Sequence, residues 1–173
     1  MKTKIIITVA LLLAVTVLYG QNKKEPLAPR PKNNFNLNLL GNSSILSFNY
    51  ERLFFIKPIF FISGELGIGY NITAYIFEPA DEAVPDHLII PHLITGNLGK
   101  GRHFCEFGLG GAIITGGSHN YILYPIIGYR LQPLRSKKVN LRLFASYPIY
   151  GKDVEESLDI IFSPIGLSFG ICF

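Results

Sequence analysis

The sequence predicts an all-β protein, a transmembrane up-and-down antiparallel β-barrel of eight strands. From Ile165 to Phe173 apolar side chains alternate with Gly, Ser and Cys, and a period of two is that of a strand with one apolar face. The chain is 49% hydrophobic and 16% charged, yet after residue 20 no apolar run is long enough for a spanning helix. An apolar chain of short alternating segments rich in Gly and aromatic residues is typical of a membrane barrel.

The first 20 residues are predicted to be a secretory signal peptide. Lys2 and Lys4 precede an uncharged run that ends at Leu18, and cleavage is expected after Gly20. An uncleaved anchor is the alternative, because Leu18 is larger than the residue usually found three positions before cleavage. Residues 21–33, with three prolines and four basic residues, are predicted to be a flexible periplasmic lead-in, and residues 34–173 the outer-membrane barrel domain.

Eight alternating segments follow the lead-in in order. They are residues 34–40, 44–55, 59–76, 87–98, 102–115, 120–132, 138–149 and 159–173. The first is short, and residues 41–43 (Gly-Asn-Ser) fit either a hairpin turn or a bulge inside one longer strand. We favour the hairpin, since seven strands would leave the two chain ends on opposite sides of the barrel.

The connections between these segments sort by charge. The short ones are flanked or filled by basic residues, namely Lys57, Lys100, Arg102, Arg135, Lys137 and Lys138. Two longer ones are acidic, with Glu78, Asp81, Glu82 and Asp86 in the first and Asp153, Glu155, Glu156 and Asp159 in or beside the second. Short periplasmic turns and longer external loops are the rule for such barrels, so both termini are expected in the periplasm.

The alternation also predicts which side chains point inward. In most segments the non-apolar face carries Gly, Ser or Asn together with a few charges, and residues 87–98 fit either orientation. A soluble lipocalin-like barrel would turn the apolar face inward and expose a glycine-rich surface that buries little. We therefore expect a polar interior holding the five charged residues Glu51, Glu65, Glu106, Arg130 and Arg142. A salt-bridged plug is the preferred interpretation, because buried charges need partners, and a gated conduit for protons or small ions is the alternative.

Several stretches carry a family resemblance. Ser47–Arg52, Gly99–Gly110, Gly128–Pro133 and the carboxy-terminal strand resemble small outer-membrane β-barrel proteins of Gram-negative bacteria that lack an assigned activity. The resemblance implies that outer-membrane lipid and lipopolysaccharide surround the chain. It also implies that Phe169, Ile171 and Phe173 form the signal read by the barrel-assembly machinery.

Other activities find little support in the sequence. Some small barrels modify lipid A with a Ser and a His near the outer rim, and the candidates here are Ser118, His119, His87 and His92. Adjacent residues in a strand or tight loop point to opposite sides, so Ser118 and His119 are not expected to pair and no enzyme is predicted.

No cofactor, metal or nucleic-acid site is predicted either, because metal-ligand spacings and nucleotide fingerprints are missing from the sequence and the basic turns are short and scattered. The acidic loops could hold divalent cations at the lipopolysaccharide surface, but solvated loops are the simpler interpretation. Cys105 and Cys172 are expected to remain unpaired, since they belong to non-adjacent strands and opposite faces.

Overall fold

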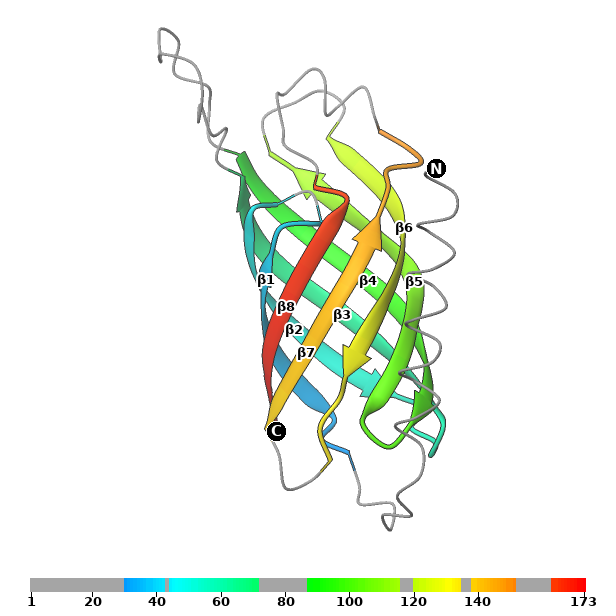
Figure 1. Cartoon of the computed structure of the whole chain (residues 1–173). Helices are drawn as coiled ribbons and strands as arrows, with labels where there is room; N and C mark the ends of the chain where they lie inside the picture. Colours follow the sequence, from blue (N-terminus) through cyan, green and yellow to red (C-terminus); the bar gives the residue numbers. More distant parts are fainter. Residues whose placement is uncertain (1–29, 43, 72–86, 116–119, 135–137, 152–162) are drawn as a thin grey trace, which may run out of the picture.

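The computed structural model describes residues 30–42, 44–71, 87–115, 120–134, 138–151 and 163–173. These residues form a closed barrel in which each strand pairs antiparallel with its neighbours in sequence and β1 pairs with β8 (Figure 1). The strands are β1 (Asn33–Leu39), β2 (Leu46–Phe54), β3 (Phe60–Asn71), β4 (His87–Lys100), β5 (His103–Ile114), β6 (Tyr121–Leu131), β7 (Val139–Ser146) and β8 (Ile165–Cys172). The predicted all-β, eight-stranded, up-and-down barrel is confirmed.

The strand ends differ modestly from the predicted ones. β7 ends at Ser146 instead of Ile149, and Tyr150 forms an isolated bridge with Leu123. β4 continues two residues further than expected, to Lys100. The predicted extensions at residues 72–76 and 159–162 lie outside the described residues, as do the acidic residues of both long loops.

A hairpin joins β1 to β2, so the alternative of one bulged strand is wrong. Leu40, Gly41 and Asn42 all have positive φ angles (59°, 66° and 50°), and the Leu40 amide donates to the Ile45 carbonyl at 2.9 Å. A Cβ atom on Gly41 would lie 2.7 Å from the Phe144 ring. Glycine is required here both by the left-handed backbone and by the close approach of that ring.

The two ends of the barrel have different connections. The described residues at the short-turn end are 55–59, 101–102, 132–134 and 138, together with residues 30–32 and Phe173; those at the long-loop end are 40–42, 44–45, 115, 120, 147–151 and 163–164. Figure 1 shows the carboxy terminus at the short-turn end. Of the basic residues predicted to mark the short turns, Lys57, Lys100, Arg102 and Lys138 are described, and they lie at the same end as the start of β1 and the end of β8.

The wall is polar inside and apolar outside. Large hydrophobic side chains are more often exposed than buried, and the exposed ones include Phe48, Ile94, Ile127 and Ile171 at more than 60%. Buried inward positions carry Asn, Ser, Gly and charged residues, together with apolar residues such as Phe61, Phe104 and Ile122. The inward faces predicted for β2, β5, β6, β7 and β8 are the observed ones, as are Glu65, Gly67 and Gly69 on β3.

β4, whose pattern fits either orientation, is resolved by the structure. Leu88, Ile94 and Leu98 are exposed, whereas Leu93 and Asn97 are buried. This strand thus contributes both apolar and polar side chains to the interior, which is why its alternation is weak in the sequence.

Candidate functional site in the barrel interior

The five charged residues predicted to point inward are all buried inside the barrel. They come from five strands, Glu51 from β2, Glu65 from β3, Glu106 from β5, Arg130 from β6 and Arg142 from β7, and none is more than 6% exposed. Each lies in the part of its strand nearer the short-turn end. Closure of the barrel brings all five into one cluster.

Their ion pairs form a chain of alternating charge. The Arg130 guanidinium makes a fork with Glu51, with Nη1 to Oε1 and Nη2 to Oε2 both at 2.6 Å, and Nη1 lies 3.5 Å from Oε1 of Glu106. Arg142 donates Nε to Oε2 of Glu106 at 3.0 Å and Nη1 to Oε2 of Glu65. The order is Glu51, Arg130, Glu106, Arg142, Glu65, so each guanidinium lies between two carboxylates.

Amide side chains of β1 hold the two ends of this chain. Asn34 donates Nδ2 to Oε2 of Glu51 at 2.7 Å, and Asn38 donates Nδ2 to Oε1 of Glu65 at 2.9 Å. Asn36, between them, donates to both carboxylates, at 3.2 Å and 3.4 Å. Hydrogen bonds that satisfy the remaining lone pairs are what a buried ion pair needs to offset its desolvation.

Arg30 supplies a third buried cation at the short-turn end. Its Nη2 donates to the Gly101 carbonyl at 2.7 Å, and its Cζ lies 4.5 Å from the centre of the Phe104 ring, a cation–π distance. Burial, and after it the charge of Arg130, lowers the pKa of Arg30 to about 10, so the group is cationic at neutral pH. Arg30 thus adds a third buried arginine to the described interior, while the ion pairs of the three buried glutamates are made by Arg130 and Arg142.

Arg30 belongs to the segment predicted to be a flexible lead-in. The structure describes only residues 30–33 of that segment: Asn33 is already part of β1, and the Arg30 side chain is buried against the mouth of the barrel. The lead-in therefore contributes to the interior, which its composition does not indicate.

Apolar clusters lie on both sides of the charges. At the short-turn end Leu53, Phe61 and Phe104 pack together, with the Phe61 and Phe104 rings 4.9 Å apart. Toward the long-loop end a larger buried cluster is built from β4, β5 and β6, and it comprises Ile89, Leu93, Ala112, Ile114, Ile122, Tyr124 and Ile126. The interior is thus polar and salt-bridged at one level and apolar at the levels beside it.

The histidines considered for lipid A chemistry point to opposite faces of β4. His87 is buried inside the barrel, with Nδ1 2.7 Å from the Thr115 carbonyl, whereas His92 is on the outer wall with Nε2 2.9 Å from the Tyr121 hydroxyl. Ser118 and His119 lie outside the described residues. In the described part of the chain, no group of three or more His, Cys, Asp or Glu is placed to hold a metal ion.

The two cysteines and the three terminal-strand residues lie where the alternation puts them. Cys105 is free and exposed on the outer wall, and Cys172 is free and buried inside. Phe169, Ile171 and Phe173 are all exposed on the outside, and the Phe173 ring stacks on Phe35 with centroids 5.4 Å apart.

Sequence reasoning missed the polar residues that surround the charges. Asn34, Asn36 and Asn38 alternate with apolar residues, a period-two signal that marks them as inward. Gln132, whose Oε1 accepts from Nε of Arg130 at 2.9 Å, shares the inward parity of Arg130. Arg30 carries no such signal, because it precedes the first strand.

Fold and interior together define a class: closed eight-stranded antiparallel barrels with an apolar outer wall and a polar, salt-bridged interior. Comparison of the chain with protein-family models, with curated proteins and with solved structures finds no match. Among the described residues, no helix is long and apolar enough to cross a membrane.

Proposed function

We propose that this protein is an integral β-barrel of the bacterial outer membrane, with a structural or surface role and a closed interior. The observation that carries the proposal is the inverted polarity of the wall: large apolar side chains cover the outside, while Glu51, Glu65, Glu106, Arg130 and Arg142 are buried within. In water such a surface would be a very large exposed apolar patch, whereas hydrocarbon is a favourable environment for it. The signal peptide predicted at residues 1–20 and the terminal Phe173 support export and assembly there.

A closed interior is favoured over a pore by the way the charges are held. The guanidiniums of Arg130 and Arg142 are fully buried, and both are bonded to carboxylates on other strands. Opening a path would separate at least one of these pairs, and breaking a buried pair costs about 3–5 kcal/mol. The apolar cluster toward the long-loop end adds a second obstacle to ions.

Cell fractionation tests the membrane assignment directly. The folded protein should be recovered with the outer membrane and should migrate differently in gels before and after boiling. Recovery as a soluble periplasmic protein would contradict the proposal.

Two further measurements separate a structural barrel from a pore or an enzyme. In planar lipid bilayers the wild-type protein should give no discrete conductance steps. Regular steps would show that the protein is a narrow pore and not a closed barrel. The mass spectrum of lipid A should be the same in cells with and without the protein. A lost or added acyl chain would instead identify a lipid A-modifying enzyme.

A further inference from the structure

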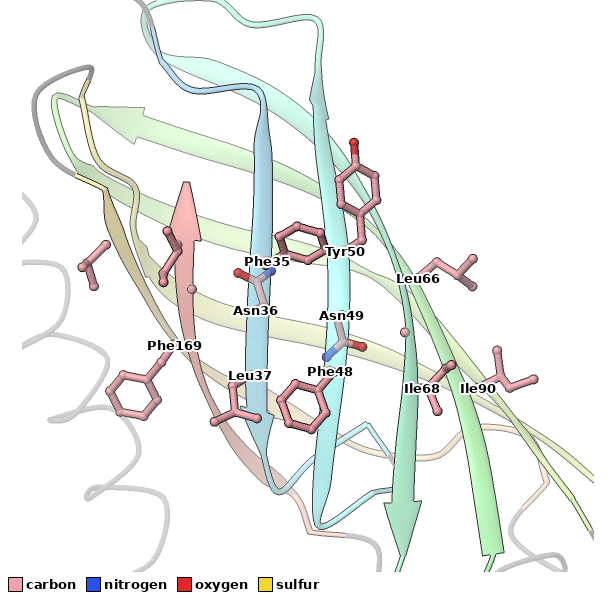
Figure 2. Close-up of a pocket in the computed structure, with 14 residues that line it drawn as sticks. Phe35, Asn36, Leu37, Phe48, Asn49, Tyr50, Leu66, Ile68, Ile90 and Phe169 are labelled. Carbon is pink, nitrogen blue, oxygen red and sulfur yellow. The ribbon is translucent and has the colours of Figure 1, made fainter. Parts of the chain in front are cut away.

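The outer wall has an apolar hollow over β8, β1, β2 and β3. Its volume is about 720 Å³, within the usual range for sites that bind small organic molecules. Figure 2 shows the side chains that line it, and the apolar ones include Phe35, Leu37, Phe48, Leu66, Ile68 and Phe169. A long apolar chain would fit such a lining.

The hollow becomes polar toward the short-turn end. Tyr50 lines it there, and its hydroxyl donates to Oδ1 of Asn33 at 2.8 Å. The next outward residue of β2 is Arg52, which is exposed and lies in register with Gly64 on β3 and Asn33 on β1. The Phe54 ring lies close to Gly64, and Cζ of Arg52 is 6.0 Å from the centre of that ring, so the guanidinium lies just beyond the short-turn end of the hollow.

Within the described part of the chain, no acidic side chain lies on the outer wall beside Arg52. The acidic side chains within the described residues are Glu51, Glu65 and Glu106, and all three are buried in the interior. Lys32 and Lys138, both exposed, precede the strands that flank this face. The hollow therefore ends in basic residues whose counter-charge is not supplied by a side chain of the described wall.

We propose that the hollow and Arg52 bind one anionic phospholipid from the membrane leaflet at the short-turn end. An acyl chain lies along the apolar lining, and the phosphate group meets Arg52, with Lys32 and Lys138 adding attraction for the headgroup. The inference rests on the proposed membrane location.

A second copy of the chain is the less favourable occupant. In a symmetric dimer the same patch faces itself, so the basic residues at the short-turn ends of both copies would be brought together. An anionic lipid would neutralise these basic residues, whereas a dimer would place like charges next to one another.

The experiment uses tryptophan fluorescence, because the chain has no tryptophan of its own. Leu66→Trp places the reporter in the hollow, and Leu109→Trp places it on the outer wall of β5; these leucines are 59% and 49% exposed. Each variant is folded into phosphatidylcholine vesicles that contain a minor fraction of brominated phosphatidylglycerol or brominated phosphatidylcholine. Bromine quenches the tryptophan of any lipid-contacting site.

At Leu66→Trp, the brominated anionic lipid should quench far more than the neutral one, with a local enrichment of about fivefold for one basic residue. The two lipids should quench equally at Leu109→Trp. Adding Arg52→Gln should abolish the excess, whereas Lys100→Gln, on β4 at the same end, should preserve it.

Equal quenching by the two lipids at Leu66→Trp, or an excess that survives Arg52→Gln, would overturn the lipid site while leaving the membrane location intact. Protection of Leu66→Trp from both lipids, together with a dimer in analytical ultracentrifugation, would assign the hollow to a second copy. Absence of quenching at Leu109→Trp would show that the barrel is not in the bilayer, and both proposals would fall.

Discussion

Glu106 is the central residue of the buried charge chain, since it accepts from Arg142 and lies 3.5 Å from Arg130. Neither arginine therefore depends on one glutamate alone. Glu51 and Glu65, at the ends of the chain, each receive one guanidinium together with amides of β1. Loss of one arginine would leave a buried carboxylate without its cation, and an uncompensated buried charge strongly destabilises the folded protein.

Replacing Arg130 by Ala should lower the free energy of unfolding by about 3–5 kcal/mol, because Glu51 then loses both bonds of its fork. Adding Glu51→Gln to the same molecule should restore part of this loss, since the uncompensated charge is removed. Urea unfolding of the folded barrel in lipid vesicles measures both effects.

The control is Lys100→Ala, an exposed basic residue on β4 at the same end of the barrel and outside the proposed lipid site, which should change stability by no more than about 0.5 kcal/mol. If Arg130→Ala were as stable as wild type and carried an ion current, the charges would form a conduit and not a plug.

At the scale of the element, β8 shows how small inward residues allow the interior to close. Asn36 on β1 and Asn140 on β7 are both in register with Gly170 on β8. The Asn140 amide donates to Oδ1 of Asn36 at 3.1 Å, so the two side chains join across β8. A Cβ atom at position 170 would collide with the Oδ1 atoms of both residues.

Gly170→Ala should therefore destabilise the barrel by about 1–3 kcal/mol, the usual cost of overpacking a filled interior. Gly64→Ala on β3 is the control, since a Cβ atom there meets only the Phe54 ring at an ordinary 3.4 Å. Urea midpoints of the two variants check the difference. Equal midpoints would mean that the bond between the two asparagines is not needed.

β8 also carries the proposed assembly signal. Phe173 lies beyond the last ladder pair, and its amide donates to the Asn33 carbonyl at 2.9 Å while its ring stacks on Phe35. These contacts give the residue a packing role that is independent of any recognition by other proteins.

Deleting Phe173 should sharply reduce the heat-modifiable folded protein in the outer membrane of cells, while the purified variant still refolds in detergent. Phe35→Ala, which removes the same ring contact from the other side, should assemble in cells. If Phe35→Ala failed to the same degree, the defect would lie in packing, and the recognition proposal would be wrong.

At the scale of the whole molecule, successive connections alternate between the two ends of the barrel, and an even number of strands places the first and last strand ends at the same one. This parity makes the topology testable, although the tagged positions themselves lie outside the described residues except for Lys57. Tags inserted in residues 78–86 or 153–157 should be labelled by an impermeant reagent on intact cells. Tags at Lys57 or Ser136 should be labelled only after the outer membrane is opened, and the reverse pattern would invert the proposed orientation.

The sequence by itself determined the strands and most of their faces. Side-chain alternation is a local property of each strand, so Glu51, Glu65, Glu106, Arg130 and Arg142 can be assigned to one side of the wall without knowing how the strands pair. The count of eight and the sorting of turn charges follow from the order of segments along the chain. Local patterns cannot show which inward side chains meet across the interior of the barrel.

Only the tertiary structure decided the partners. Arg130 bonds to Glu51, 79 positions away in sequence, because the stagger of every strand around the closed barrel fixes the levels at which the two side chains meet. The orientation of β4 also depends on the tertiary structure. Its inward side chains meet an apolar cluster at one level, through Ile89 and Leu93, and the Ser63 hydroxyl at another, through Thr95. Arg30 was recruited from outside the strands because the mouth of the closed barrel offers the Phe104 ring and the Gly101 carbonyl together. Such a site exists only after residues far apart in the chain have been brought to one place.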